Sequence, residues 1–247
     1  MKKSVVIIDS GIGGLSLLPN FLKKLPIKKY VYFADIKNLP YGEKTTEDLF
    51  NIAVSNIRFV LKKFNPLFIV IGCNTIGMCI YNDLCKFFSN VKIFSVKPNL
   101  EICSYNKMNL VLATSRTIDC LQKTLKKDKQ TILLKMPKLA SLVEKNLNNF
   151  KNIYPYLKNK LEKYKNFKNI ILGCTHYYFV KEEISKIIPD AKIVDGVEIL
   201  SNEINKYLLK NNFRDKNKKV KVKLYFTNKC ENKKVYKELI RYIIVNL

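Results

Sequence analysis

Two cysteines in matched surroundings are the residues of this sequence best suited to carry out chemistry. Cys73 lies in the segment GCNT (72–75) and Cys174 in the segment GCTH (173–176), and an apolar run precedes each of them. The two segments are about one hundred positions apart. Cysteines that only fill a core do not need the same neighbours twice, so we interpret the pair as one functional thiol in each half of the chain.

Two thiols that face each other across one carbon atom can invert its configuration. A thiol has a reference pKa of about 8.5, and hydrogen-bond donors or a helix amino end lower it. One thiol can therefore act as a thiolate base while the other remains an acid. The first removes a proton from one face and the second returns a proton to the opposite face. The pattern predicts stereoinversion without a cofactor.

The other five cysteines lack such a context, and we expect them to be small buried packing residues. The chain has a single histidine, His176, and no CxxC pair, so a zinc site is not expected. Seven cysteines also fit poorly with a disulfide framework in a chain of 247 residues. We expect reduced thiols and a cytoplasmic protein. The five packing cysteines are Cys79, Cys85, Cys103, Cys120 and Cys230.

A glycine-rich loop, DSGIGG (9–14), follows the first apolar run. It stands where a dinucleotide fingerprint would stand, but Ser16 replaces the third glycine, and no Lys-Ser or Lys-Thr follows for a P-loop. A nucleotide is therefore disfavoured. The loop amides at the start of a helix are suited to hold a carboxylate.

Short apolar runs alternate with longer helical patterns along the chain, which is typical of parallel sheets covered on both faces. We predict an α/β fold of two similar lobes, each a mainly parallel sheet flanked by helices. The crevice at the carboxyl ends of the strands is where such sheets bind ligands. The expected strands are 4–8, 30–34, 67–71, 91–95, 109–113, 131–135, 169–172 and 220–226. The main expected helices are 15–25, 45–64, 77–88, one that follows 114–115 and ends at 125, 139–147 and 153–164.

The repeat also predicts the division into domains. Residues 1–96 are expected to form the first lobe and residues 97–200 the second. The last segment, 201–247, is expected to complete the first lobe.

The net charge of +25 comes from 45 lysines and arginines against 20 acidic residues. Only four of the basic residues are arginines, whose planar fork suits nucleic-acid readout, and the lysines occur in almost every segment. We therefore expect nucleic-acid binding to be weak and non-specific. No apolar run is long enough to cross a bilayer or to form a signal peptide, so a membrane association is not expected. The arginines are Arg58, Arg116, Arg214 and Arg241.

Taken in order along nearly the whole chain, several motifs resemble the cofactor-independent aspartate and glutamate racemases, and among them the glutamate racemases. The resemblance includes Asp35 and the segment PYGEKT (40–45). The Pro-Tyr-Gly and Cys-Thr-His-Tyr elements are similar to those of the glutamate racemases in particular. The other matching segments are 9–15, 72–75, 113–114 together with Thr117, and 172–177.

The resemblance implies a two-base reaction that interconverts L-glutamate and D-glutamate, with no cofactor and no metal, for peptidoglycan synthesis. Cys73 is implied to take the proton from D-glutamate and Cys174 from L-glutamate. Asp9 is implied to assist Cys73, and His176 to assist Cys174, with Glu144 as a further acid near the second thiol. Other interpretations stay open: a helix cap for Asp9, a satisfied core histidine for His176 and a solvated acid for Glu144.

The resemblance also implies the groups that hold the substrate's carboxylates and ammonium, together with a homodimeric assembly. Three stretches depart from the family pattern: Lys37-Asn38, Arg116 and 136–141. Two alternatives remain at this point, a racemase of aspartate or another amino acid and a basic scaffold that binds nucleic acid or a topoisomerase. The implied substrate-binding residues are Asp9, Ser10, Tyr41, Gly42, Asn74, Thr75, Thr117, Thr175 and His176.

Overall fold

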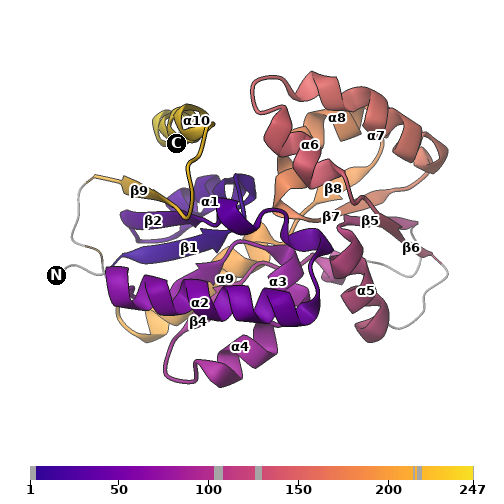
Figure 1. Ribbon diagram of the computed structural model, residues 1–247. Helices are drawn as coiled ribbons and strands as arrows, with labels where there is room; N and C mark the ends of the chain where they lie inside the picture. The colour runs from indigo at the N-terminus through magenta and orange to yellow at the C-terminus, as the bar shows by residue number, and fades with distance from the viewer. Residues whose placement is uncertain (1–3, 103–107, 126–129, 214, 216–218, 247) are drawn as a thin grey trace.

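The computed structural model describes residues 4–102, 108–125, 130–213, 215 and 219–246. Cys103 and Arg214 lie outside the described residues. Figure 1 shows two α/β lobes side by side, the first around β1 and the second around β7. The predicted fold class, two parallel sheets flanked by helices, is confirmed.

The first sheet has five strands in the order β4-β3-β1-β2-β9, and every neighbouring pair is parallel. All five residues of β1 are buried, because helices cover both faces of the sheet. The strands are β1 (Val5–Asp9), β2 (Lys29–Ala34), β3 (Ile69–Ile71), β4 (Ile93–Ser95) and β9 (Lys221–Phe226).

The second sheet has four parallel strands in the order β6-β5-β7-β8. Its two central strands, β5 and β7, are buried along their whole length. The carboxyl ends of β1 and β3 in one sheet and of β7 in the other are followed directly by most of the predicted site residues, whereas Tyr41 and Gly42 lie in η3, Thr117 in α5 and Glu144 in α6. The strands are β5 (Asn109–Ala113), β6 (Thr131–Lys135), β7 (Asn169–Gly173) and β8 (Lys192–Val194).

Ten α-helices pack around these sheets in the described part of the chain, joined by short 3₁₀ turns (Figure 1). The turns that matter for the site are η1 (Gly13–Leu17), η3 (Tyr41–Glu43) and η7 (Thr175–Val180). The helices are α1 (Leu18–Lys24), α2 (Thr46–Phe64), α3 (Asn74–Cys79), α4 (Tyr81–Phe87), α5 (Ser115–Thr124), α6 (Leu139–Lys145), α7 (Tyr154–Leu161), α8 (Lys181–Ile187), α9 (Val197–Lys210) and α10 (Lys233–Val245).

Helix α2 illustrates how the sequence determines an element. The Thr45 side chain caps its start by accepting a hydrogen bond from the Asp48 amide, and the helix ends at Asn65 in the left-handed conformation (φ 42°). The buried residues recur at helical spacing and face the first sheet. They are Leu49, Ala53, Val54, Asn56, Ile57 and Val60.

Two predicted helices differ in detail from the observed ones. The helix expected over 15–25 begins as the 3₁₀ turn η1 and becomes α-helical only at Leu18. The helix expected over 77–88 starts earlier, at Asn74, and divides into α3 and α4 at Ile80, whose backbone is not helical (φ −138°, ψ 3°). Cys73 is followed by the short helix α3. Cys174 is followed by the 3₁₀ turn η7, and the α-helix α8 begins only at Lys181.

The carboxyl-terminal segment returns to the first sheet, where β9 pairs with β2 and α10 packs against α1. Helix α9 begins at Val197 and also packs against α1. The domain limits at 96/97 and 200/201 stay a prediction. Within the described ranges, none of the helices is both long enough and apolar enough to cross a membrane.

Candidate active site

The two thiols lie at equivalent places in the two sheets. Cys73 follows β3 and is the residue before α3, and Cys174 follows β7 and is the residue before η7. Both are buried, with exposed fractions of 8% and 9%. Burial raises the pKa of the Cys73 thiol, and the neighbouring Asp9 and Cys174 raise it further. Cys174 therefore lies close enough to Cys73 for its charge to affect the pKa of the Cys73 thiol.

Asp9 stands at the end of β1 between the two thiol segments. Its Oδ1 accepts hydrogen bonds from the Ser10 amide (2.5 Å) and the Ser10 hydroxyl (3.2 Å), and its Oδ2 accepts one from Thr175 Oγ1 (3.1 Å). A Cβ at Gly72, the residue before Cys73, would lie 3.3 Å from Asp9 Oδ2. Burial raises the pKa of Asp9 to about 6, although His176 opposes this shift. Asp9 thus contacts the segments of both thiols.

Glu144 and His176 form a chain of contacts that ends at the second thiol. Glu144 Oε1 lies 2.8 Å from His176 Nε2, and His176 Nδ1 lies 3.8 Å from Cys174 Sγ. Glu144 Oε1 also accepts a hydrogen bond from the Ile12 amide (2.6 Å). Burial lowers the pKa of His176, but Cys174 and Glu144 outweigh burial, and the pKa lies well above its usual value. A helix of the second lobe thereby orients the imidazole toward the thiol.

The amides of the glycine-rich loop bind carboxylates of the protein itself. The Ser10 and Gly11 amides donate to Asp9, and the Ile12 amide donates to Glu144. A Cβ at Gly13 would lie 2.5 Å from His176 Nδ1. Glycine is required at that position because the loop passes directly against the second thiol's segment.

Three hydroxyls from the two lobes meet beside the thiols. Thr75 Oγ1 on α3 lies 3.2 Å from Thr114 Oγ1 and accepts a hydrogen bond from Thr117 Oγ1 of α5 (3.0 Å). The Asn74 side-chain amide nitrogen is buried in the same region and has no hydrogen-bond partner in the described part of the chain. A buried donor of this kind costs free energy unless a ligand satisfies it.

The Pro-Tyr-Gly segment supports the site by packing and by a buried hydrogen bond. The Tyr41 hydroxyl donates to Asp35 Oδ2 (2.7 Å), away from the thiols. Gly42 packs against the second lobe, since a Cβ there would lie 2.6 Å from Cβ of Thr114. Tyr41 is therefore a buried support of the loop, and its hydroxyl is engaged by Asp35.

Asp35 is a supporting residue that the sequence reasoning did not assign to the site. It is fully buried and accepts hydrogen bonds from Asn38, Tyr41, Asn56 and Thr227 at 2.7 to 3.1 Å. These donors come from the loop, α2 and the end of β9. A carboxylate directly after a buried strand was the signal that could have found it. One departure from the family pattern, Asn38, is thus engaged in this cluster.

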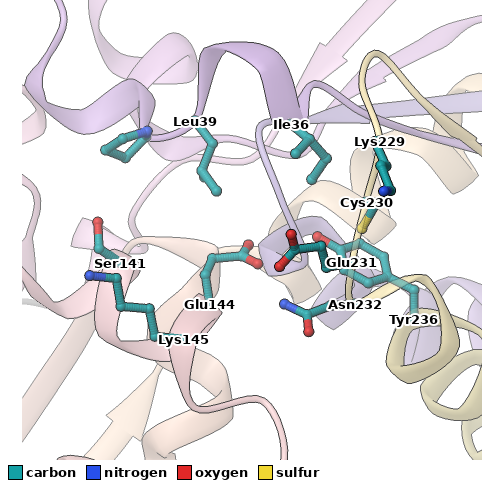
Figure 2. A pocket seen from close by; sticks show the side chains of 11 residues that line it. Ile36, Leu39, Ser141, Glu144, Lys145, Lys229, Cys230, Glu231, Asn232 and Tyr236 are labelled. Carbon is teal, nitrogen blue, oxygen red and sulfur yellow. The ribbon is translucent and has the colours of Figure 1, made fainter.

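A cavity of about 570 Å³ lies outside the thiol site. Figure 2 shows Glu144 and Glu231 extending into it from opposite walls. Cys73 and Cys174 are not among its lining residues, which are Ile36, Leu39, Pro40, Ser141, Glu144, Lys145, Lys229, Cys230, Glu231, Asn232 and Tyr236. Glu144 is the residue shared by the cavity and the His176 contact.

The expectation for the other cysteines is wrong in two respects. Cys79 of α3 and Cys120 of α5 form a disulfide, because the two helices pack together with the Cα atoms 5.5 Å apart. Cys85 and Cys230 are free thiols, and they are half-buried rather than fully buried. Pairing between residues in different lobes leaves no local spacing pattern. In the described ranges, no group of three or more His, Cys, Asp or Glu side chains is placed to hold a metal.

Comparison with known proteins gives consistent results. No protein-family model matches the chain. The glutamate racemase of Clostridium novyi is 34% identical, with 98% of each chain covered. The crystal structure of glutamate racemase from Thermus thermophilus in complex with β-chloro-D-alanine is 25% identical, covers 97% of this chain and 93% of that chain, and has a TM-score of 0.80. The Francisella tularensis glutamate racemase in complex with D-glutamate shares the fold, with a TM-score of 0.81 at 24% identity over 97% of this chain and 94% of that chain.

The two parallel α/β lobes and the curated relatives identify the chain as an amino-acid racemase, an isomerase. The likeness to the curated relatives extends over the whole chain and not over one lobe alone. The chain belongs to the glutamate racemase family.

Proposed function

We propose that this enzyme interconverts L-glutamate and D-glutamate by proton transfer between Cys73 and Cys174. The observation that carries the proposal is the pair of buried thiols at matched strand ends, with His176 beside Cys174 and Asp9 close enough to Cys73 for its charge to raise the thiol pKa. A thiol in each lobe can reach one face of a carbon atom held between the lobes. Product D-glutamate would supply peptidoglycan synthesis in the cytoplasm.

In the direction from D-glutamate, Cys73 removes the α-proton with help from Asp9. The raised pKa of Cys73 disfavours a free thiolate, so a nearby acceptor for its proton is needed. Asp9, with a pKa of about 6, is ionised at neutral pH, and we propose that it receives that proton as Cys73 takes the α-proton. Cys174 then donates its own proton to the opposite face, and L-glutamate is released.

In the direction from L-glutamate, Cys174 is the base and Cys73 the acid. His176 lies 3.8 Å from the Cys174 sulfur and supports the thiolate as an imidazolium. Glu144 stabilises that positive charge and fixes the orientation of the ring. The arrangement resembles the orienting role of a carboxylate behind a histidine in other acid–base sites.

Substrate binding would use hydrogen-bond donors of both lobes. The unpartnered Asn74 amide and the hydroxyls of Thr75 and Thr117 are suited to one carboxylate of glutamate. We propose that Ser10, Gly42 and Thr175 bind the rest of the substrate, as the family resemblance implies. Donors aimed at the carboxylate stabilise the negative charge that builds up next to it when the α-proton leaves.

We propose a homodimer as the assembly.

The deciding experiment follows racemisation of L-glutamate in deuterium oxide. The polarimetric signal should decay to zero, and the D-glutamate formed should carry deuterium at the α-carbon. Cys73→Ala and Cys174→Ala should each lose racemisation by about 10²-fold or more, because an acid or a base is missing. Cys85→Ala, which removes a half-buried free thiol elsewhere, is the matched control and should keep normal turnover. Full turnover of either active-site variant would refute the two-thiol mechanism.

A further inference from the structure

The disulfide between Cys79 and Cys120 connects the two lobes next to the thiol site. Cys79 is the last residue of α3, whose first residues follow Cys73, and Cys120 lies in the middle of α5. The first helix belongs to the β3 side and the second to the β5 side of the crevice. The covalent bond therefore crosses the boundary along which the lobes meet.

The same two helices carry proposed substrate-binding groups. Helix α3 holds Asn74 and Thr75, and α5 holds Thr117 behind its cap Thr114. The hydroxyls of Thr75 and Thr117 are 3.0 Å apart and both residues are buried, so the space between them is closed. Arg116 Nε adds a further contact by donating to the Lys44 carbonyl across the same boundary (2.8 Å).

Both thiols are buried where the lobes meet, so glutamate can reach them only when the lobes move apart. Cys73 and Cys174 are at most 9% exposed, and Asp9, Asn74 and Thr75 at most 3%. Opening between α3 and α5 would break the contacts between hydroxyls, which are weak and easily re-formed with water. The disulfide is different because it is covalent and keeps Cys79 of α3 and Cys120 of α5 at a fixed separation.

We propose that Cys79–Cys120 is a redox-exchangeable site that controls lobe opening, and that its reaction partner is a low-molecular-weight thiol. A thiolate attacks one of the two sulfurs, the S–S bond breaks, and the electron pair leaves on the other sulfur, which takes a proton. A second thiol attacks the mixed disulfide. Two cysteine thiols and one small-molecule disulfide result. Oxidation is the reverse reaction with that disulfide as the oxidant.

Accessibility favours this bond over the active-site thiols as the place of exchange. Both Cys79 and Cys120 are half-buried, whereas Cys73 and Cys174 are buried. A small thiol can approach the disulfide from solvent while the closed lobes cover the active-site sulfurs. The oxidised enzyme is therefore the closed, slow form, and the reduced enzyme is the form that opens and turns over.

The test compares the full chain in two redox states. The protein is equilibrated with oxidised glutathione or with dithiothreitol, excess reagent is removed, and the Cys79–Cys120 peptide link is checked by non-reducing mass spectrometry. Racemisation is then followed by circular dichroism. We expect reduction to raise kcat/KM several-fold in the wild type. Cys79→Ser and Cys120→Ser should match the reduced wild type in both treatments, and Cys85→Ser should respond as the wild type does.

Three results would overturn the inference: no Cys79–Cys120 link after oxidation, equal rates of the oxidised and reduced wild type, or an unchanged redox response in Cys79→Ser. The last would assign the response to another cysteine. The inference rests on the proposed racemase mechanism, but the two failures are distinguishable. Turnover of the reduced enzyme tests the mechanism, and the ratio between the two redox states tests the disulfide without relying on any variant.

Discussion

Glu144 and His176 connect the outer cavity with the Cys174 thiol through contacts of 2.8 and 3.8 Å. Glu144 also accepts a hydrogen bond from the Ile12 amide of the other lobe. One carboxylate oxygen thus both orients the imidazole and holds the lobes together. The two thiols therefore have different neighbours: the Asp9 carboxylate is near Cys73, and the His176 imidazole is near Cys174.

Replacing Glu144 by Gln should test its role behind His176. The amide keeps an oxygen for the Ile12 N–H but removes the charge that stabilises an imidazolium. We expect kcat/KM to fall by about 10²-fold, equally for both isomers, because the equilibrium constant of a racemisation is one. The α-deuterium isotope effect should rise for L-glutamate and fall for D-glutamate, since proton removal by Cys174 becomes slower.

Glu231→Gln is the matched control for that variant, because Glu231 lines the same cavity on the facing wall. It should leave both the rate and the isotope effects unchanged. An isotope effect that changes by the same amount for both isomers of glutamate would contradict a specific role of Glu144 at the Cys174 side.

The pH dependence should report Asp9. Its pKa of about 6 lies above the ordinary value of 3.8, so lowering the pH through about 6 protonates it and removes the acceptor for the Cys73 proton. We expect kcat/KM to fall in this range, as measured by circular dichroism at fixed ionic strength. Asp9→Asn should be slow at all pH values and should lack this acidic limb. An unchanged acidic limb in Asp9→Asn would assign it to another group.

The raised pKa of Asp9 also makes the stability of the fold depend on pH. Because burial raises the folded-state pKa of Asp9 above its unfolded value, the folded protein binds this proton more tightly. Ionised Asp9 therefore destabilises the fold, most fully above about pH 6. This cost disappears as the pH falls from 6 toward 3.8.

Among the elements, short turns at strand ends place the site more than long helices do. The 3₁₀ turn η3 holds Gly42 against Thr114, the residue that caps α5. Buried Asp35 holds this turn in place by accepting a hydrogen bond from the Tyr41 hydroxyl. We therefore expect the packing of η3 on α5 to limit how far the lobes can close.

Gly42→Ala should prevent complete closure. The added Cβ would lie 2.6 Å from both Cβ and Cγ2 of Thr114, which belong to a β-branched side chain with little freedom. A displacement of the lobes by a fraction of an ångström to one ångström should cost up to about 10²-fold in kcat/KM. Steady-state kinetics would measure the loss, with an unchanged circular dichroism spectrum as the control for folding. Wild-type kinetics would show that the lobes close without this contact.

For the whole molecule, the net charge of +25 is a property of the surface rather than of the site. Its expected contribution is attraction of glutamate, which carries a net negative charge at neutral pH. Added salt should lower kcat/KM by less than about tenfold and leave kcat unchanged, because screening affects encounter and not the bound complex. A salt-dependent kcat would contradict a surface effect.

The same charge predicts weak nucleic-acid binding. A gel shift with duplex DNA at two salt concentrations should show binding that collapses at the higher one, as expected for phosphate contacts alone. Binding that survives high salt and depends on DNA sequence would instead favour the alternative of a basic scaffold.

The sequence by itself determined the two thiol segments, the fold class and every described strand except the short edge strand β8, because these depend on local patterns. Continuous apolar runs require burial on both faces, and a polar turn after each run marks the crevice edge. The matched surroundings of Cys73 and Cys174 indicated a functional pair before any contact was known.

Only the tertiary structure decided which side chains meet across the crevice. Glu144 and His176 are 32 positions apart, Thr175 and Asp9 166, and Cys79 and Cys120 41. No spacing rule links such residues, since their distance depends on how two lobes pack rather than on the period of a helix or strand. The same packing turned the glycine-rich loop toward the carboxylates of Asp9 and Glu144 and joined two cysteines that were expected to be free.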